Sequence, residues 1–208
     1  MAAVTESYVA VAAVYGSAVA VEAVKANETA WSTLTGASSA VMGKAAAKLA
    51  GLNPADYADM AAVASSSTAM AAVIGNSAAL NAVVSSQTAM TAIANNKTAI
   101  TAVEASAVAK NALYNSPLKT SISNIASTSS WTTRRNGKIW LISFRQTWSS
   151  GNTSMQHRST LKDGGTVSCT ASQSYNTDYR IDRFMDSITN YNSAGGIGNV
   201  CTYYFIPC

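Results

Sequence analysis

The sequence has few of the residues on which most enzymes and small secreted domains depend. Its 208 residues include one histidine, three cysteines and three prolines, and charged residues make up 12% of the chain. That share is about half of what a soluble domain usually carries. No apolar run reaches the roughly 18 residues that a membrane helix needs, and the first residues lack a basic segment. We therefore expect neither a transmembrane span nor a signal peptide, and no insertion into a membrane.

The sparse reactive residues form no catalytic or metal-binding pattern. His157 is the one histidine, and a catalytic triad needs a base beside its nucleophile. The cysteines form no CxxC pair and, with one histidine, do not complete a zinc site. Asp178, Asp182 and Asp186 recur every four residues, but arginines lie between them, which favours a salt-bridged surface over a glycosidase pair. The sequence predicts no enzymatic activity, no cofactor and no metal ion.

The three cysteines leave two states open. Free thiols fit a protein made in a reducing cytoplasm, whereas a single bridge, such as Cys169 to Cys201, fits oxidation after release from the cell.

Composition divides the chain into two parts. Up to residue 120, six lysines balance six carboxylates, while after it eight basic residues face four acids and all three cysteines occur. Pro117 and the Ser/Thr run that follows it interrupt the first pattern, so we expect a boundary near residue 120. We divide the chain into an N-terminal helical attachment region (1–50), a helical stalk (51–120) and a C-terminal tip (121–208).

Apolar residues recur every ten positions in the stalk. The two most apolar columns are Met60, Met70, Leu80, Met90 and Ile100, and Val63, Val73, Val83, Ile93 and Val103. Ten residues make about 2.8 helical turns, so an apolar stripe falls back by roughly 80° with each repeat. Two solutions fit: an overwound coiled coil of several chains, or short helices separated by bends. In the second solution the helix N-caps are Ser66, Asn76, Ser86 and Asn96.

In both solutions the apolar side of each repeat must be buried against neighbouring repeats or against other copies of the chain. We expect the two columns to form the oligomer core of an elongated, homotrimeric stalk. The alternative is a monomeric helical bundle in which residues 1–50 pack on residues 60–115.

The tip contains strand patterns and one helical pattern. Asn136-Gly137 stands between two strand-like runs and predicts a β-hairpin. Further strands are expected in "TSMQHRSTL", in "TVSCTASQSY" and, buried on both faces, in the final "VCTYYFIPC". A helix is expected in "NTDYRIDRFMDSITNYN", where four apolar residues share a helical face: Ile181, Phe184, Met185 and Ile188. The expected fold class is α+β, with a helical decad-repeat stalk followed by a small β-rich α+β tip.

The repeats "SSSTAMAAVIGNSAALNAVV" and "SSQTAMTAIANNKTAITAV", followed by "GKIWLISFRQTW" and a C-terminus rich in glycine and aromatics, resemble tail-fibre and related virion proteins of tailed bacteriophages. The resemblance implies a homotrimeric fibre in the virion. Its N-terminal region would bind other virion proteins, and its tip would bind a glycan or protein on the bacterial surface. The chain is shorter than many fibres, so a short tail fibre, a head fibre and a small decorating protein all fit.

Aromatic and arginine side chains in the tip are the candidates for receptor binding. Aromatic rings stack on sugars, and arginine donates hydrogen bonds to hydroxyl or acidic groups. The candidates are Arg134, Arg135, Trp148, His157, Arg158, Tyr175 and Tyr179. The alternative functions are nucleic-acid binding, because the tip is basic and interleaves Tyr and Trp with Arg, and a purely structural role on the particle with a helical-bundle N-terminal half.

Overall fold

The computed structural model describes residues 2–125, 132–147, 155–160, 166–171, 175–192 and 200–208. The chain divides between Leu118 and Lys119 into a helical unit (residues 1–118) and a β unit (residues 119–207). The division lies two residues before the expected boundary. Helices and strands are both present, as the predicted α+β class requires.

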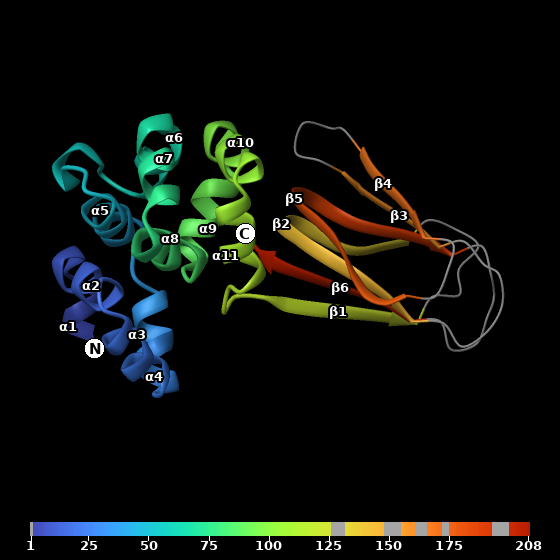
Figure 1. Cartoon of the computed structure of the whole chain (residues 1–208), viewed down its shortest axis with the longest axis horizontal. Helices are drawn as coiled ribbons and strands as arrows, with labels where there is room; N and C mark the ends of the chain where they lie inside the picture. Colours follow the sequence, from blue (N-terminus) through green and yellow to red (C-terminus); the bar gives the residue numbers. More distant parts are fainter. Residues whose placement is uncertain (1, 126–131, 148–154, 161–165, 172–174, 193–199) are drawn as a thin grey trace. The chain divides into compact units, whose positions relative to one another are not determined.

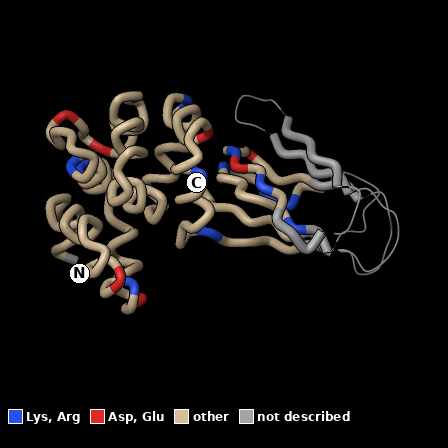
Figure 2. Tube along the Cα trace, viewed as in Figure 1, with Lys and Arg blue, Asp and Glu red and all other residues tan. Residues whose placement is uncertain are grey.

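The helical unit is built from short helices joined by very short turns (Figure 1). They are α1 (Ala2–Thr5), α2 (Tyr8–Tyr15), α3 (Ala18–Lys25), α4 (Glu28–Thr35), α5 (Ser39–Leu49), the 3₁₀ helix η1 (Pro54–Asp56), α6 (Met60–Ser65), α7 (Ser67–Gly75), α8 (Ser77–Val84), α9 (Gln87–Ala94), α10 (Lys97–Ala105) and α11 (Ala107–Tyr114). Charged residues are sparse along this unit (Figure 2).

Side-chain oxygens cap these helices, and from Ser7 to Asn27 and from Ser66 to Ser106 the caps recur every ten residues. The four predicted N-caps, Ser66, Asn76, Ser86 and Asn96, each accept a hydrogen bond from the backbone N–H three residues later, at 3.0–3.3 Å. Six further residues cap in the same way: Ser7, Ser17, Asn27, Ser38, Asp59 and Ser106. The prediction of short capped helices is confirmed, and the continuous coiled coil is wrong.

The bend at each cap determines how the helices stack. Asn76 has an extended backbone (φ −115°, ψ 116°), and the helices before and after it, α7 and α8, meet at 105°. Bends at successive caps fold the chain back on itself, so each helix lies near the third helix after it. Accordingly α5 contacts α8, α6 contacts α9, α7 contacts α10 and α8 contacts α11. The repeats wind into a superhelix with about three helices per turn.

No single helix among the described residues is long and apolar enough to cross a membrane. Two successive pairs, α2 with α3 and α7 with α8, reach the length together, but they bend by 99° and 105° between their helices.

The two apolar columns form the interior of one chain, which corrects their assignment to an oligomer core. Nine of the ten residues are at most 4% exposed: Met60, Val63, Met70, Val73, Leu80, Val83, Met90, Ile93 and Val103. Ile100 is half-buried. The helix three repeats away covers each column, so the repeat alone requires no second chain. Contacts of α2 and α5 with α8 also join residues 1–50 to the rest of the unit.

The backbone of α5 closely approaches the backbone at the start of α6, at the end of the irregular stretch between these helices. A Cβ atom on Gly43 of α5 would lie 2.2 Å from the carbonyl carbon of Asp59. At the same junction the Ser39 hydroxyl accepts a hydrogen bond from the backbone N–H of Met60 at 3.2 Å. Only glycine fits at position 43, because any side chain would overlap backbone that starts α6.

The β unit is one antiparallel sheet of six strands in the order β1-β6-β2-β5-β3-β4. The strands are β1 (Thr120–Ile125), β2 (Thr132–Thr147), β3 (Met155–Thr160), β4 (Thr166–Ala171), β5 (Tyr175–Asn192) and β6 (Val200–Pro207). The predicted buried final strand is confirmed. It is β6, which pairs with β1 and β2, and its Tyr203, Phe205 and Ile206 are buried.

Two predictions for the β unit are wrong. Asn136-Gly137 makes no hairpin but lies inside β2, where the register against β5 shifts between Asn136 and Ile139 and Gly137 has φ 101°. The predicted helix over residues 176–192 is part of strand β5. Its register against β2 also shifts near Asp182, which has φ 52°. Such bulges change the alternation of side chains, so apolar residues at helical spacing were compatible with a strand.

Candidate functional site

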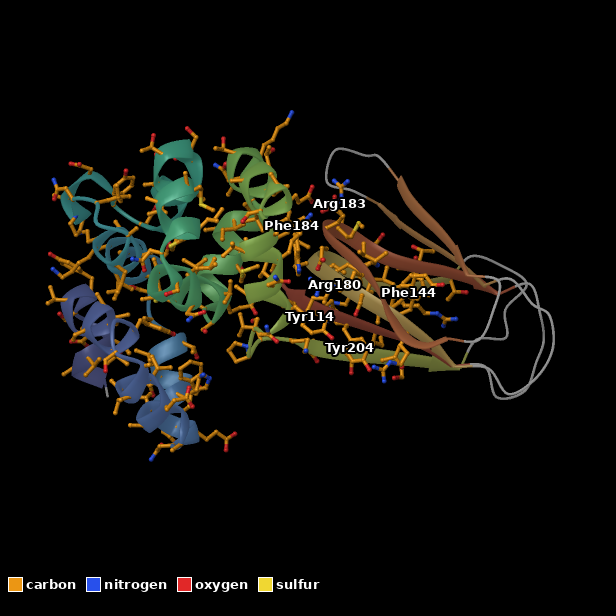
Figure 3. The ribbon with its side chains drawn as sticks, viewed as in Figure 1. Tyr114, Phe144, Arg180, Arg183, Phe184 and Tyr204 are labelled. Carbon is orange, nitrogen blue, oxygen red and sulfur yellow. The ribbon has the colours of Figure 1, made fainter. Side chains whose placement is uncertain are left out.

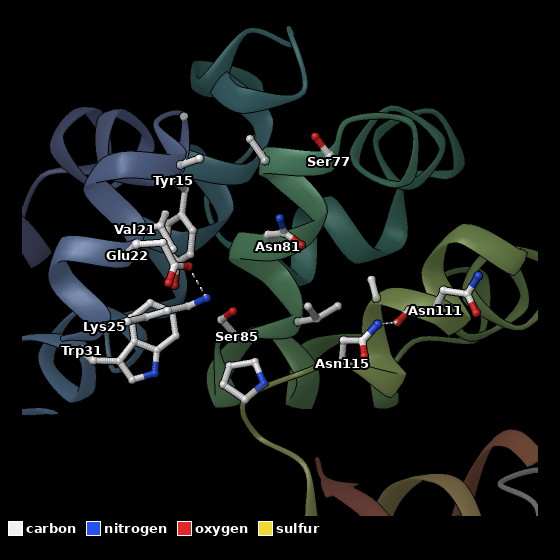
Figure 4. Close-up of a pocket in the computed structure, with 16 residues that line it drawn as sticks. Tyr15, Val21, Glu22, Lys25, Trp31, Ser77, Asn81, Ser85, Asn111 and Asn115 are labelled. Atoms are coloured by element: carbon white, nitrogen blue, oxygen red, sulfur yellow. Dashed lines mark hydrogen bonds and ion pairs between the residues drawn. The ribbon is translucent and has the colours of Figure 1, made fainter.

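A groove of about 600 Å³ opens on the helical unit (Figure 4). Residues of α2, α3 and α4 line one side, and residues of α8 and α11 with the turns that follow them line the other. A volume of this size lies within the usual range for small-ligand sites. We take this groove as the candidate functional site.

One side of the groove combines an aromatic ring with an ion pair. Trp31 is half-buried, and Lys25 lies over its ring with Nζ 5.5 Å from the ring centroid. Lys25 Nζ also lies 2.9 Å from Glu22 Oε1; the Glu22 side chain is 72% exposed and that of Lys25 is 43% exposed. The ring of Tyr15 meets Trp31 edge to face, with the centroids 6.4 Å apart. These contacts hold Trp31 in one orientation and neutralise the charges beside it.

The opposite side presents amides and hydroxyls. Ser77 and Asn81 come from α8, and Asn111 and Asn115 come from α11 and its end, and all four residues are exposed. The Asn115 amide donates a hydrogen bond to the backbone oxygen of Asn111 at 3.0 Å. Asn81 and Asn111 each follow their N-caps, Asn76 and Ser106, by five residues. Because α8 contacts α11, equal repeat positions bring these two amides to the same wall.

Tyr15 also lines the groove, and it is deeply buried. The residue is 4% exposed, and its hydroxyl has no hydrogen-bond partner among the described residues. Burial raises the pKa of the Tyr15 phenol well above its usual range, and the nearby Ser85 hydroxyl opposes part of this rise. No hydrogen bond of ordinary geometry joins the two oxygens. The phenol is protonated at neutral pH, and its O–H proton has no acceptor among the described residues.

The predicted receptor-binding residues of the β unit are only partly described. Arg134 and Arg135 are half-buried on β2, and the Arg135 guanidinium lies 5.2 Å from the Phe205 ring centroid. Tyr179 stacks on Phe144, with centroids 5.2 Å apart and planes at 9°. Tyr179 therefore packs on the core of the sheet, to which Phe144 belongs.

The remaining candidates lie outside the described residues or side chains: Trp148, His157, Arg158 and Tyr175. On neighbouring strands β2 and β6, Arg145 lies 5.9 Å from the Tyr204 ring centroid; Tyr204 is labelled in Figure 3. Sequence reasoning did not single out this pair. Both described arginine–aromatic pairs thus place the guanidinium against rings of the sheet itself.

The possible bond between Cys169 and Cys201, one of the two states left open by the sequence, receives no support from the sheet order. The two cysteines belong to β4 and β6, and strands β3, β5 and β2 stand between these. Neighbouring strands lie about 4.8 Å apart, whereas bonded cysteines need Cα atoms within about 7 Å. The side chains themselves lie outside the described ones.

Sequence reasoning missed the groove entirely. Asn81 and Asn111 carried a usable signal, because they are identical residues at the same repeat position, three repeats apart. Trp31 and Tyr15 carried no such signal, since both precede the repeat columns, which begin at Met60. No family model matches the chain, and no curated protein matches it in sequence. The geometry of the groove is therefore the main support for a function.

Proposed function

We propose that this protein is a structural and attachment protein of a bacteriophage particle, which binds a glycan or protein on the surface of the bacterial host. The resemblance of its decad repeats to tail-fibre and related virion proteins supports the setting. The groove supports binding as the activity, and it adds a recognition surface in the helical unit to the one expected in the β unit.

The lining of the groove is the observation that carries this proposal. It combines an oriented indole, Trp31, with amide and hydroxyl groups and a self-neutralised ion pair, Glu22 with Lys25. Convergent polar groups around an aromatic surface are what a recognition site requires. Glu22 is the one carboxylate of the lining, and it is largely exposed and paired with lysine. We therefore keep a non-enzymatic role as the proposal.

A homotrimer remains part of the proposal, but the apolar columns do not supply its interface. Its contacts must come from other surfaces, and three exposed valines are available for them: Val9, Val19 and Val108, with 48%, 82% and 61% of their surface exposed. Each stands two residues after an N-cap. Light scattering of the purified chain should give about three times 21.5 kDa, and a clean monomer would contradict the trimer.

Competition for host cells tests the attachment role. Purified chain in excess should slow the adsorption of the phage that carries it, because both would occupy the same surface receptor. Heat-unfolded chain at the same concentration serves as the control. Unchanged adsorption at concentrations that saturate the cells would reject host attachment and leave a purely structural role on the particle.

A further inference from the structure

We propose that the groove of the helical unit binds a short, uncharged saccharide chain, with Trp31 as the stacking platform and Asn81, Asn111 and Asn115 as hydrogen-bonding groups. The inference deepens the proposed function and rests on it for the source of the ligand, the bacterial surface. The chemistry that it assigns to the groove is argued from the groove alone.

The charges of the groove indicate an uncharged ligand. Glu22 and Lys25 are the lining's two charged side chains, and their 2.9 Å ion pair cancels them. Tyr15 is neutral at pH 7, because the ordinary pKa of a phenol is about 10 and burial raises it further. A phosphate or a polyuronic acid would meet no net positive charge here, and it would also face the Glu22 carboxylate. Recognition must therefore come from hydrogen bonds and from contact with apolar surface.

The amides indicate a ligand with many hydroxyl groups. Each asparagine side chain offers two N–H donors and one carbonyl acceptor, and each hydroxyl group can both donate and accept. Neither Asn81 nor Asn111 uses its side chain in a hydrogen bond with a described residue, and both are exposed in the lining. They come from packed helices, whose axes lie about 8–10 Å apart. A ligand that contacts both asparagines must span this distance, which a chain of sugar rings does more readily than a single ring.

Trp31 supplies the apolar contact that a sugar ring requires. Lys25 and Tyr15 fix the indole by a cation–π and an edge-to-face contact, so little side-chain freedom is lost when a ligand stacks on it. The unpartnered, nine-tenths buried hydroxyl of Tyr15 in the same lining is a second sign of a ligand. A buried hydroxyl without a partner is costly, and a bound hydroxyl, directly or through a water, would satisfy it.

Calorimetric titration of the full chain tests the assignment. The probes are uncharged trisaccharides of glucose, galactose and N-acetylglucosamine, with trigalacturonic acid as the charged comparison and a polar uncharged peptide as the alternative class. We expect at least one uncharged trisaccharide to bind at millimolar concentration or tighter and trigalacturonic acid to bind at least tenfold more weakly. No uncharged trisaccharide binding, or a preference for the acid or the peptide, would overturn the proposal.

Two variants and a matched control locate the site. Trp31→Ala should weaken binding at least tenfold, and Asn111→Ala about threefold to tenfold, the usual range for one lost hydrogen bond. Thr101→Ala is the control, because Thr101 is exposed, follows its N-cap Asn96 by the same five residues and lies outside the lining. Trp31→Phe serves if the alanine variant does not fold, with a smaller loss. Equal binding by wild type and the folded Asn111→Ala and Trp31 variants would also overturn the assignment.

The two proposals fail separately. Trisaccharide binding without any effect of the chain on phage adsorption would reject host attachment and leave the ligand assignment standing. Adsorption that excess Trp31→Ala chain blocks as well as wild type, together with no trisaccharide binding, would reject the groove as the site and leave attachment to another surface.

Discussion

Asn81 and Asn111 occupy the same position on two helices in contact, although thirty residues separate them in the chain. Each follows its N-cap by five residues, and α8 contacts α11. The bend at each cap brings every third repeat into register, so residues thirty apart share a face. The repeat therefore sets the surface chemistry as well as the core. Substitutions at one repeat position act on different surfaces, depending on the repeat that carries them.

Adjacent serines provide a first prediction, on capping. Ser66 caps α7 by accepting a hydrogen bond from Ala69 N–H at 3.2 Å, whereas Ser67 is exposed. Ser66→Ala should lower the free energy of unfolding of the helical unit by about 1 kcal/mol. Ser67→Ala should change it by less than about 0.5 kcal/mol. Urea unfolding followed by helical circular dichroism measures both. Equal losses in the two variants would show that the cap does not stabilise the bend.

The helix starts were predictable because capping is local. A serine or asparagine before an alanine-rich segment has a favourable partner in the N–H three residues later, and the cap oxygens at Ser66 to Asn96 use it. The choice of partner for the apolar columns was not predictable in this way. Burial against another chain and burial against the third following repeat satisfy the same pattern, and the bend angle decides between them.

Strand β5 could not be predicted from local sequence patterns, for a different reason. Phe184, Met185 and Ile188 follow a helical spacing, yet they pair with β2 across register shifts. Alternation predicts faces only in a regular strand. The bulges depend on the long-range pairing of β2 with β5, which no local pattern records. The groove was hidden for a related reason, since Trp31 lies across the groove from α8 and α11 only through the winding of the whole unit.

Glycine positions provide a second prediction, with opposite outcomes. Gly43→Ala should destabilise the helical unit by about 1–3 kcal/mol, as overpacked cores do, because its Cβ would lie 2.2 Å from Asp59 backbone. Gly75→Ala should leave stability unchanged or raise it by up to about 1 kcal/mol, because no atom lies within 4 Å of a Cβ there and α7 ends at this residue. Thermal unfolding of both variants under one condition measures the contrast. A tolerated alanine at position 43 would contradict the close approach of α5 to the start of α6.

Burial of the apolar columns within one chain provides a third prediction. Met70 is 1% exposed, whereas Thr101 is exposed. Met70→Ala should cost about 2–5 kcal/mol of stability, and Thr101→Ala should change it by less than about 0.5 kcal/mol. Below its unfolding transition, the Met70→Ala variant should have the same molar mass by light scattering as the wild type. A smaller oligomer from folded Met70→Ala would restore the columns as an interface between chains.

Tyr15 provides a fourth prediction, on alkaline stability. Burial raises the pKa of its phenol in the folded state above the value of about 10 expected in the unfolded chain. The folded chain then binds more protons than the unfolded one above pH 10, so its stability falls as pH rises through that value. Tyr15→Phe should show a shallower decline of the unfolding midpoint above pH 10 and the same slope at pH 7–9. Parallel curves at all pH values would mean that the phenol ionises equally in both states.

Asp182 provides the last prediction, on the bulge of the β unit. Its backbone has φ 52°, and its Oδ2 accepts hydrogen bonds from Arg180 Nε at 2.9 Å and lies 2.8 Å from Nη2. A left-handed conformation costs an ordinary side chain roughly 1–2 kcal/mol but costs asparagine and glycine less. Asp182→Ala loses the ion pair and keeps the strained backbone, so it should be the least stable variant. Asp182→Gly loses the same ion pair, but glycine adopts this backbone conformation without strain. Its free energy of unfolding should therefore exceed that of Asp182→Ala by about 1 kcal/mol. Asp182→Asn keeps a side-chain acceptor and should lie closest to wild type in the unfolding midpoint. An alanine variant as stable as the glycine variant would show that the bulge relaxes to a regular strand once the carboxylate is removed.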